Sequence, residues 1–170
     1  MAYNKLNVLH WHVVDDQSWP LHLEAFPNLT LKGAYSPRHV YSPEDVRSIV
    51  EYARLRGIRV IPELDTPGHT QALGKAFPDV LTPCYATNEP GTAAFGRFAS
   101  FEILDPTRNF TYQLVHNLLL EIRKLFPDPY VHLGMDEVYY ACWYYADTVS
   151  HNHRNILPSQ SNEIICYFSQ

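Results

Sequence analysis

The pattern of apolar and polar residues predicts a helix that begins after Ser42 and stops at Gly57. Ser42 and Asp45 have the spacing of a capping box, and Pro43 suits the first helical position. Apolar residues then recur at the spacing that places them on one helical face: Val46, Ile49, Val50 and Ala53. A glycine at the end of such a run favours termination of the helix.

A second helix is predicted from about Thr111 to Phe126, because apolar residues again share one face and prolines follow. Short apolar runs predict strands over residues 6–12, 58–64 and 130–133. The order strand, helix, strand, helix, strand is typical of a parallel sheet with helical connections, so the fold class is α/β. The connection over residues 66–106 is too long for a plain loop, and such loops usually carry function.

The chain length and the extent of the pattern indicate two parts of unequal character. With 170 residues the chain suits one domain but is shorter than the roughly 250 residues of a whole (β/α)₈ barrel. The pattern of strands and helices continues over residues 1–147, which form the predicted domain. Residues 148–170 show no clear period and are interpreted as a divergent C-terminal tail.

Composition excludes several classes of partner. The formal net charge is -5 and no basic run occurs, which argues against binding to nucleic acid or to an anionic membrane surface. No apolar stretch approaches the roughly 20 residues that span a bilayer, and the N-terminus lacks the pattern of a signal peptide. Sequons at Asn28 and Asn109 are a weak indication of a secretory route. Aromatic residues make up 14% of the chain, and their flat apolar faces suit either a sugar-binding cleft or the core.

Each predicted strand runs into an acidic or histidine-bearing segment. The first is followed by Asp15 and Asp16, the second by a segment that ends at His69, and the third by Asp136 and Glu137. In a (β/α)₈ barrel, active sites are built from residues at the carboxyl ends of the strands. Two adjacent carboxylates resist joint ionisation, which raises the pKa of one of them and makes it usable as a general acid. The sequence therefore predicts an acid/base site at this edge of the sheet.

These segments resemble glycoside hydrolase family 20, the family of lysosomal-type β-N-acetylhexosaminidases. The third strand and its end are similar to the family's H-x-G-G-D-E signature. The similarity covers roughly residues 1–145, in register, through five segments: LHWHVVDD (9–16), YARLRGIRV (52–60), ELDTPGH (63–69), LTPCY (81–85) and HLGMDEV (132–138). The resemblance implies part of a (β/α)₈ TIM barrel, about strands two to four of the family's catalytic domain. It also implies the removal of terminal non-reducing N-acetylhexosamine (GlcNAc or GalNAc) residues.

The resemblance assigns roles to four residues. It makes Glu137 the proton donor and later the base, and it makes Asp136 the residue that stabilises the acetamido group of the sugar. The mechanism implied is retaining and substrate-assisted, since the acetamido oxygen of the substrate itself attacks the anomeric carbon. Asp15 and His69 would orient Glu137 and tune its pKa. No cofactor and no metal is implied.

Further implications concern the cell and the covalent structure. The resemblance implies a lysosomal or secreted protein, glycosylated at Asn28 and Asn109. It implies a disulfide between Cys84 and Cys142, with Cys166 left unpaired. The expected substrates are glycans, glycolipids or chitin oligosaccharides, and relatives of this type form dimers.

The sequence departs from the family signature at Met135, which replaces the second glycine. Glycine at such a turn often permits a positive φ angle or close approach of the backbone, so methionine there would strain the turn or crowd the acetamido pocket. A non-catalytic remnant of such an enzyme is therefore one alternative. A metal-dependent barrel hydrolase is another, because several residues could supply ligands: His10, His12, His69, His132 and Asp136.

Overall fold

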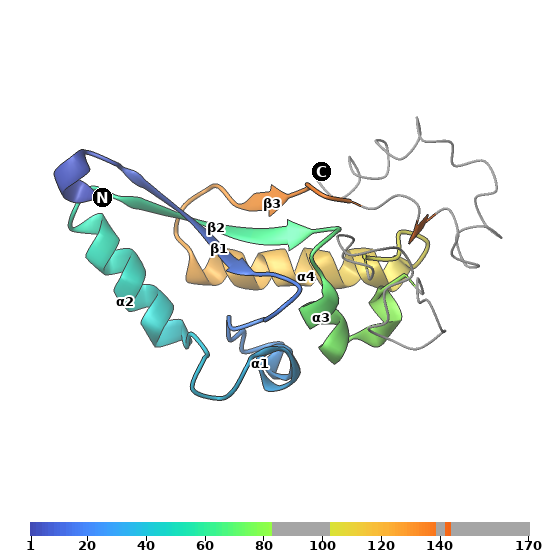
Figure 1. The fold of residues 1–170 in the computed structure, drawn as a ribbon. Helices are drawn as coiled ribbons and strands as arrows, with labels where there is room; N and C mark the ends of the chain where they lie inside the picture. Colours follow the sequence, from blue (N-terminus) through green and yellow to red (C-terminus); the bar gives the residue numbers. More distant parts are fainter. Residues whose placement is uncertain (83–102, 139–141, 144–170) are drawn as a thin grey trace.

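The computed structural model describes residues 1–82, 103–138 and 142–143 (Figure 1). Its elements follow in chain order: η1 (Ala2–Asn4), β1 (Val8–Val14), α1 (Pro27–Gly33), α2 (Pro43–Arg54), β2 (Arg59–Thr66), α3 (Gln71–Ala76), η2 (Pro78–Val80), α4 (Asn109–Leu125) and β3 (His132–Gly134). Strands and helices alternate as the sequence predicts, which confirms the α/β class. None of the helices in these ranges is long and apolar enough to cross a membrane.

The three strands form one parallel sheet in the order β1-β2-β3. Because the strands are parallel, their carboxyl ends meet at one edge of the sheet. His12 pairs with Glu63, and Glu63 in turn pairs with His132. The register between β1 and β2 shifts after His12, so that Val14 rather than Val13 pairs with Leu64. Such a bulge places one extra residue on β1 and redirects the residues that follow it.

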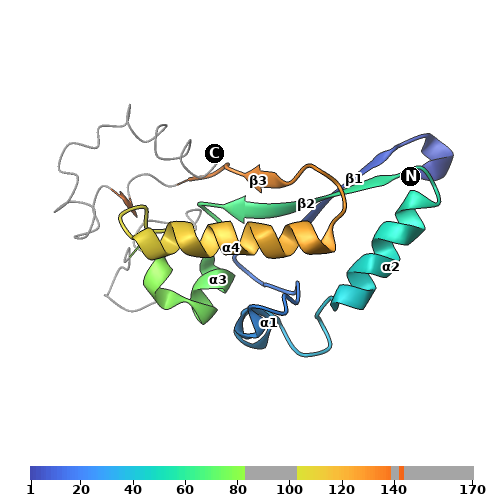
Figure 2. The ribbon, with the colours of Figure 1, turned by 180° about the vertical axis from the view of Figure 1, so that it is seen from behind.

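The core lies on the helical side of the sheet. Figures 1 and 2 show α4 running across one face of the strands. Leu114, Leu118 and Ile122 of α4 are buried in one cluster with Val60 and Leu64 of β2. Burial of a leucine or isoleucine side chain contributes about 1.5–3 kcal/mol, so this face holds α4 on the sheet. The opposite face of the sheet carries the polar side chains.

The helices follow local signals closely. Ser42 caps α2, with both hydrogen bonds of the capping box present, and Gly57 has a φ angle of 67° just after the helix. The predicted helix from Thr111 to Phe126 corresponds to α4, although α4 begins two residues earlier, at Asn109. The strands are offset by about two residues from their predicted positions, because their extents are set by pairing with neighbouring strands rather than by local propensity. The predicted tail, residues 148–170, lies outside the described residues.

Candidate active site

The ends of the three strands bring the predicted acidic residues and a histidine together. Asp15 follows β1 directly, His69 lies three residues after β2, and Asp136 and Glu137 lie just after β3. These four residues are far apart in the sequence but share the carboxyl edge of the sheet, where a (β/α)₈ barrel builds its active site.

His69 is the centre of this group. Its Nδ1 lies 3.1 Å from Asp15 Oδ1 in a hydrogen bond, and its Nε2 lies 3.6 Å from Glu137 Oε2. Asp65 Oδ2 lies 3.8 Å from the same Nε2, and Asp16 Oδ2 lies 3.9 Å from Nδ1. The imidazole thus lies between Asp15 and Asp16 on its Nδ1 side and Asp65 and Glu137 on its Nε2 side.

Three carboxylates raise the pKa of His69. Burial by itself would lower this pKa, but Asp65, Asp15 and Asp16 outweigh burial and raise it above its usual value. The hydrogen bond that His69 donates to Asp15 acts in the same direction. A charged His69 can donate a proton from each ring nitrogen, to Asp15 on one side and toward Glu137 on the other.

Asp65 is a site residue to which the sequence pattern gave no role of its own. Its side chain is only 1% exposed. Burial raises the pKa of Asp65 to about 6, and the carboxylates of Asp136 and Glu63 act in the same direction while His69 and His12 oppose them. Its position could be inferred from alternation, because Asp65 lies two residues after Glu63 and so faces the same side of β2.

Unsatisfied polar atoms gather at the same place. Asp65 Oδ1 and His69 Nε2, which both belong to this site, are among the described side-chain atoms that are buried without a hydrogen-bond partner. Buried polar atoms are nearly always paired in proteins, so a group of unpaired ones at a strand end is typical of a site that a ligand or water completes.

The turn after β3 is held in an unusual backbone conformation. Gly134, Met135 and Glu137 all have positive φ angles, of 70°, 74° and 51°. Methionine at position 135 therefore occupies a conformation that favours glycine, as the departure from the family signature predicted. Glu137 itself has a side chain that is 72% exposed, so it can reach a substrate from this turn.

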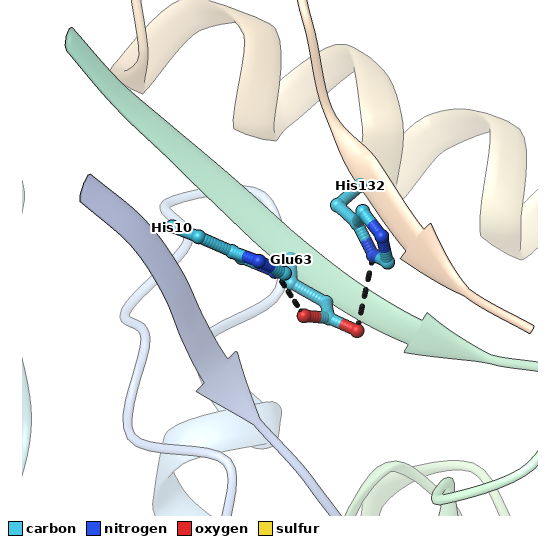
Figure 3. A group of neighbouring side chains, drawn as sticks. All are labelled: His10, Glu63 and His132. Atoms are coloured by element: carbon cyan, nitrogen blue, oxygen red, sulfur yellow. Dashed lines mark hydrogen bonds and ion pairs between the residues drawn. The ribbon is translucent and has the colours of Figure 1, made fainter. Parts of the chain in front are cut away.

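A second polar group, with one residue from each strand, lies on the same face of the sheet, farther from the carboxyl ends of the strands. His10 Nε2 contacts Glu63 Oε2, and His132 Nδ1 lies 3.1 Å from Glu63 Oε1 (Figure 3). His12 lies between this group and the strand ends, with Nδ1 3.7 Å from Glu63 Oε2 and Nε2 3.4 Å from Asp15 Oδ2. The sequence suggested the histidines as metal ligands but missed Glu63, which the parallel register brings between them.

Four groups of side chains in the described part of the chain have the composition and spacing to hold a metal ion. They are His10, Glu63 and His132; His12, Glu63 and Asp65; Asp15, Asp16 and His69; and Asp65, His69 and Asp136. The last two groups coincide with the strand-end site. Their carboxylates are equally suited to acid/base chemistry, so the proximity of these residues does not by itself decide between the two interpretations.

The remaining predicted residues are distributed away from the strand ends. Asn28 and Asn109 are both exposed, the first in α1 and the second at the start of α4. Cys142 is completely buried, whereas Cys84 and Cys166 lie outside the described residues. All three tryptophans contribute to packing: Trp19 and Trp143 are buried, and Trp11 packs edge-on against two other aromatic rings.

Comparison with known proteins identifies relatives that match this chain in sequence. The model of the glycosyl hydrolase family 20 catalytic domain matches residues 1–170. The β-hexosaminidase subunit beta of Mus musculus is 55% identical over 143 residues, which cover 84% of this chain and 25% of that protein. The human subunit beta is 53% identical over 143 residues, covering 84% of this chain and 24% of that protein. The chain thus spans about a quarter of the length of these curated relatives.

Solved structures agree with the sequence relatives. The chitobiase of Flavobacterium johnsoniae superimposes with a TM-score of 0.81 at 32% identity, covering 99% of this chain and 25% of that one. The exo-β-N-acetylglucosaminidase of Vibrio harveyi, solved with N-acetylglucosamine, has a TM-score of 0.73 at 28% identity, covering 96% of this chain and 28% of that one. The fold is a partial (β/α)₈ barrel, as predicted. The chain belongs to glycosyl hydrolase family 20.

Proposed function

We propose that this chain carries the acid/base residues of a retaining β-N-acetylhexosaminidase that removes terminal GlcNAc or GalNAc residues. The observation that carries the proposal is the chain of side chains from Asp15 through His69 to Glu137 at the carboxyl edge of the sheet. Glu137 is reachable, and a histidine whose own position is fixed by Asp15 stands beside it.

In this proposal Glu137 protonates the glycosidic oxygen and later deprotonates water. His69 Nε2 lies 3.6 Å from Glu137 Oε2, and rotation of the exposed Glu137 side chain would bring the two within hydrogen-bond distance and favour one orientation of the carboxyl group. Burial lowers the pKa of His69, but Asp65, Asp15 and Asp16 raise it by more, which favours a charged imidazole beside Glu137.

Asp136 serves the acetamido group of the substrate. Its carboxylate lies in one group with the Asp65 carboxylate and the His69 imidazole, with ligand atoms within 4.8 Å of one another. The Asp136 carboxylate would accept a hydrogen bond from the acetamido N–H as positive charge develops on the substrate.

Glycans, glycolipids and chitin oligosaccharides with a terminal N-acetylhexosamine are the proposed substrates, and a dimer is proposed by family analogy. We also propose a lysosomal or secreted location, which the exposed sequon residues Asn28 and Asn109 support. The proposed disulfide joins Cys84 to Cys142, and the complete burial of Cys142 is compatible with a structural disulfide there. Peptide mapping without reduction tests it: a Cys84 peptide linked to Cys166 would contradict it.

The function is tested with Glu137→Gln and a poorly activated N-acetylglucosaminide as substrate. The assay uses the 170-residue chain and, in parallel, the mouse subunit beta in which this chain replaces the matching segment. Loss of acid catalysis should reduce kcat by about 10²–10⁴-fold. Near-normal kcat in Glu137→Gln would overturn the assignment.

The two proteins also separate the catalytic proposal from its alternative. If the replaced subunit is active and the 170-residue chain is not, Glu137 keeps its role and the chain alone is a non-catalytic remnant. Replacement of His116, an exposed residue on α4, by glutamine is the matched control and should leave kcat unchanged.

A further inference from the structure

We propose that His10, Glu63 and His132 form a binding site for a divalent transition-metal ion, with Zn²⁺ the best match. The site is separate from the acid/base group at the strand ends and does not depend on the proposed glycosidase activity. It consists of one residue from each strand of the sheet, on the face opposite α4 (Figure 3).

The parallel register brings the three residues together. Glu63 pairs with His132 across β2 and β3, and His10 lies on the same face of β1 as His12, the residue that pairs with Glu63. Each oxygen of Glu63 faces a different imidazole: Oε2 contacts His10 Nε2, and Oε1 lies 3.1 Å from His132 Nδ1. The two imidazole rings lie with their centroids 4.6 Å apart. The ligands are therefore already gathered on three rigid strands.

The ligand set matches the chemistry of zinc. Two imidazole nitrogens and one carboxylate are the protein ligands of a known class of zinc site, in which water takes the fourth coordination position. One potential ligand atom from each residue lies within 4.8 Å of the others. Four-coordinate zinc with bonds of about 2.0–2.2 Å needs its ligand atoms about 3.3 Å apart. Rotation of the side chains can bring the three ligand atoms to this separation.

Burial and charge favour the same conclusion. The side chain of Glu63, between the two histidines, is only 7% exposed. A metal ion bound there would meet a carboxylate with little competing water. A nearly buried carboxylate is stabilised by positive charge, which a divalent ion held by two neutral imidazoles supplies.

The other groups in the described ranges fit zinc less well. Each contains a single imidazole with two carboxylates, a set in which oxygen ligands predominate and which harder cations prefer. His12 is the nearest further ligand, with Nδ1 3.7 Å from Glu63 Oε2, and could complete the coordination. Metal binding would also compete with the hydrogen bond from the Gly134 N–H to His132 Nδ1, which is 3.0 Å long.

The test is titration of the untagged 170-residue chain with Zn²⁺ by calorimetry, and with Co²⁺ by visible absorption. One Zn²⁺ per chain is expected, together with the visible bands of four-coordinate Co²⁺. Glu63→Gln, His10→Gln and His132→Gln should each weaken Zn²⁺ binding by at least about tenfold, because even loss of a residue that only supports a metal ligand costs 10–100-fold. His116→Gln, which alters an exposed histidine on α4, is the matched control.

Circular dichroism of each variant shows whether the fold persists, and the two histidine variants keep the test valid if Glu63→Gln fails to fold. His69→Gln separates this site from the strand-end groups, and it should leave Zn²⁺ affinity within about twofold of the unaltered chain. The proposal is overturned if the chain binds no Zn²⁺, or if His69→Gln abolishes binding while His10→Gln and His132→Gln do not. Activity measurements play no part in this test.

Discussion

A Cβ atom on Gly134 would lie 1.8 Å from Oδ1 of Asp65 and 2.4 Å from its Cγ. Gly134 ends β3 with a φ angle of 70°, so both its conformation and its surroundings require glycine. The close approach places the backbone that precedes Asp136 directly against the buried carboxyl group of Asp65.

Gly134→Ala is therefore expected to destabilise the chain by about 2–4 kcal/mol, since steric overlap with a buried side chain adds to the cost of a positive φ angle. Urea unfolding measures the change. Gly57→Ala is the matched control, because Gly57 also has a positive φ angle, 67°, but a Cβ there meets nothing within 4 Å. Equal losses in the two variants would show that the contact with Asp65 is unimportant.

Met135 offers a test of backbone strain. At a φ angle of 74°, glycine should be more stable than alanine, so Met135→Gly is expected to exceed Met135→Ala in free energy of unfolding by about 1 kcal/mol. The exposed helical residue Ser48 should show the opposite order, with alanine above glycine by about 1 kcal/mol. The same order at both positions would mean that the turn relaxes without strain.

The raised pKa of Asp65 predicts a dependence of stability on pH. The folded protein binds this proton up to about pH 6, whereas the unfolded chain releases it near 3.8, so folding is penalised progressively as pH rises through this interval. Relative to Asp65→Asn, the unaltered chain should lose on the order of 1–3 kcal/mol between about pH 4 and about pH 7. If the free energies of unfolding of the unaltered chain and Asp65→Asn differ by the same amount at both pH values, the raised pKa of Asp65 is contradicted.

The raised pKa of His69 predicts that the free energy of unfolding falls at higher pH. Because its pKa is raised in the folded state, its charge contributes stability that is fully present below the unfolded pKa of about 6.5 and is lost as pH rises through the folded pKa. His69→Gln should therefore cost more stability at about pH 6 than at about pH 9. Thermal unfolding at the two pH values measures this difference, and His116→Gln should show no comparable change between them.

Asp136→Asn tests the proposed role in binding the acetamido group. If Asp136 stabilises charge that appears only near the transition state, the substitution should lower kcat more than it raises KM. A thiazoline mimic of the intermediate should bind the variant more weakly than the unaltered site. Equal affinity for this mimic would remove Asp136 from the proposed role.

The sequence predicted the parts of the fold that depend on neighbouring residues. The capping box of Ser42 and Asp45 is complete within four residues, so it could be recognised without any tertiary information. The short helices α1 and α3 carry no side-chain cap and too few turns for a recognisable apolar period, so they could not. Their formation depends on packing against each other and on the core.

The residues of the candidate site likewise include some that the sequence could predict and some that it could not. Asp15, His69, Asp136 and Glu137 could be proposed from strand ends and from family resemblance, and the structure brings them together. Glu63 could not be assigned, because its importance arises from the register between β1, β2 and β3, whereas the side of β2 that Asp65 faces follows from alternation along that strand. Which residues face each other across parallel strands is not encoded by any one strand alone.

The bulge in β1 changes which of its residues face which side of the sheet. Up to His12, even-numbered residues of β1 face the side of the sheet that carries Glu63, and after the extra residue odd-numbered ones do. This change of parity gives Asp15 its place beside His69, while Asp16 accepts a hydrogen bond from the Gln71 amide instead. Because β1 contains this one extra residue, the adjacent aspartates Asp15 and Asp16 accept hydrogen bonds from different partners.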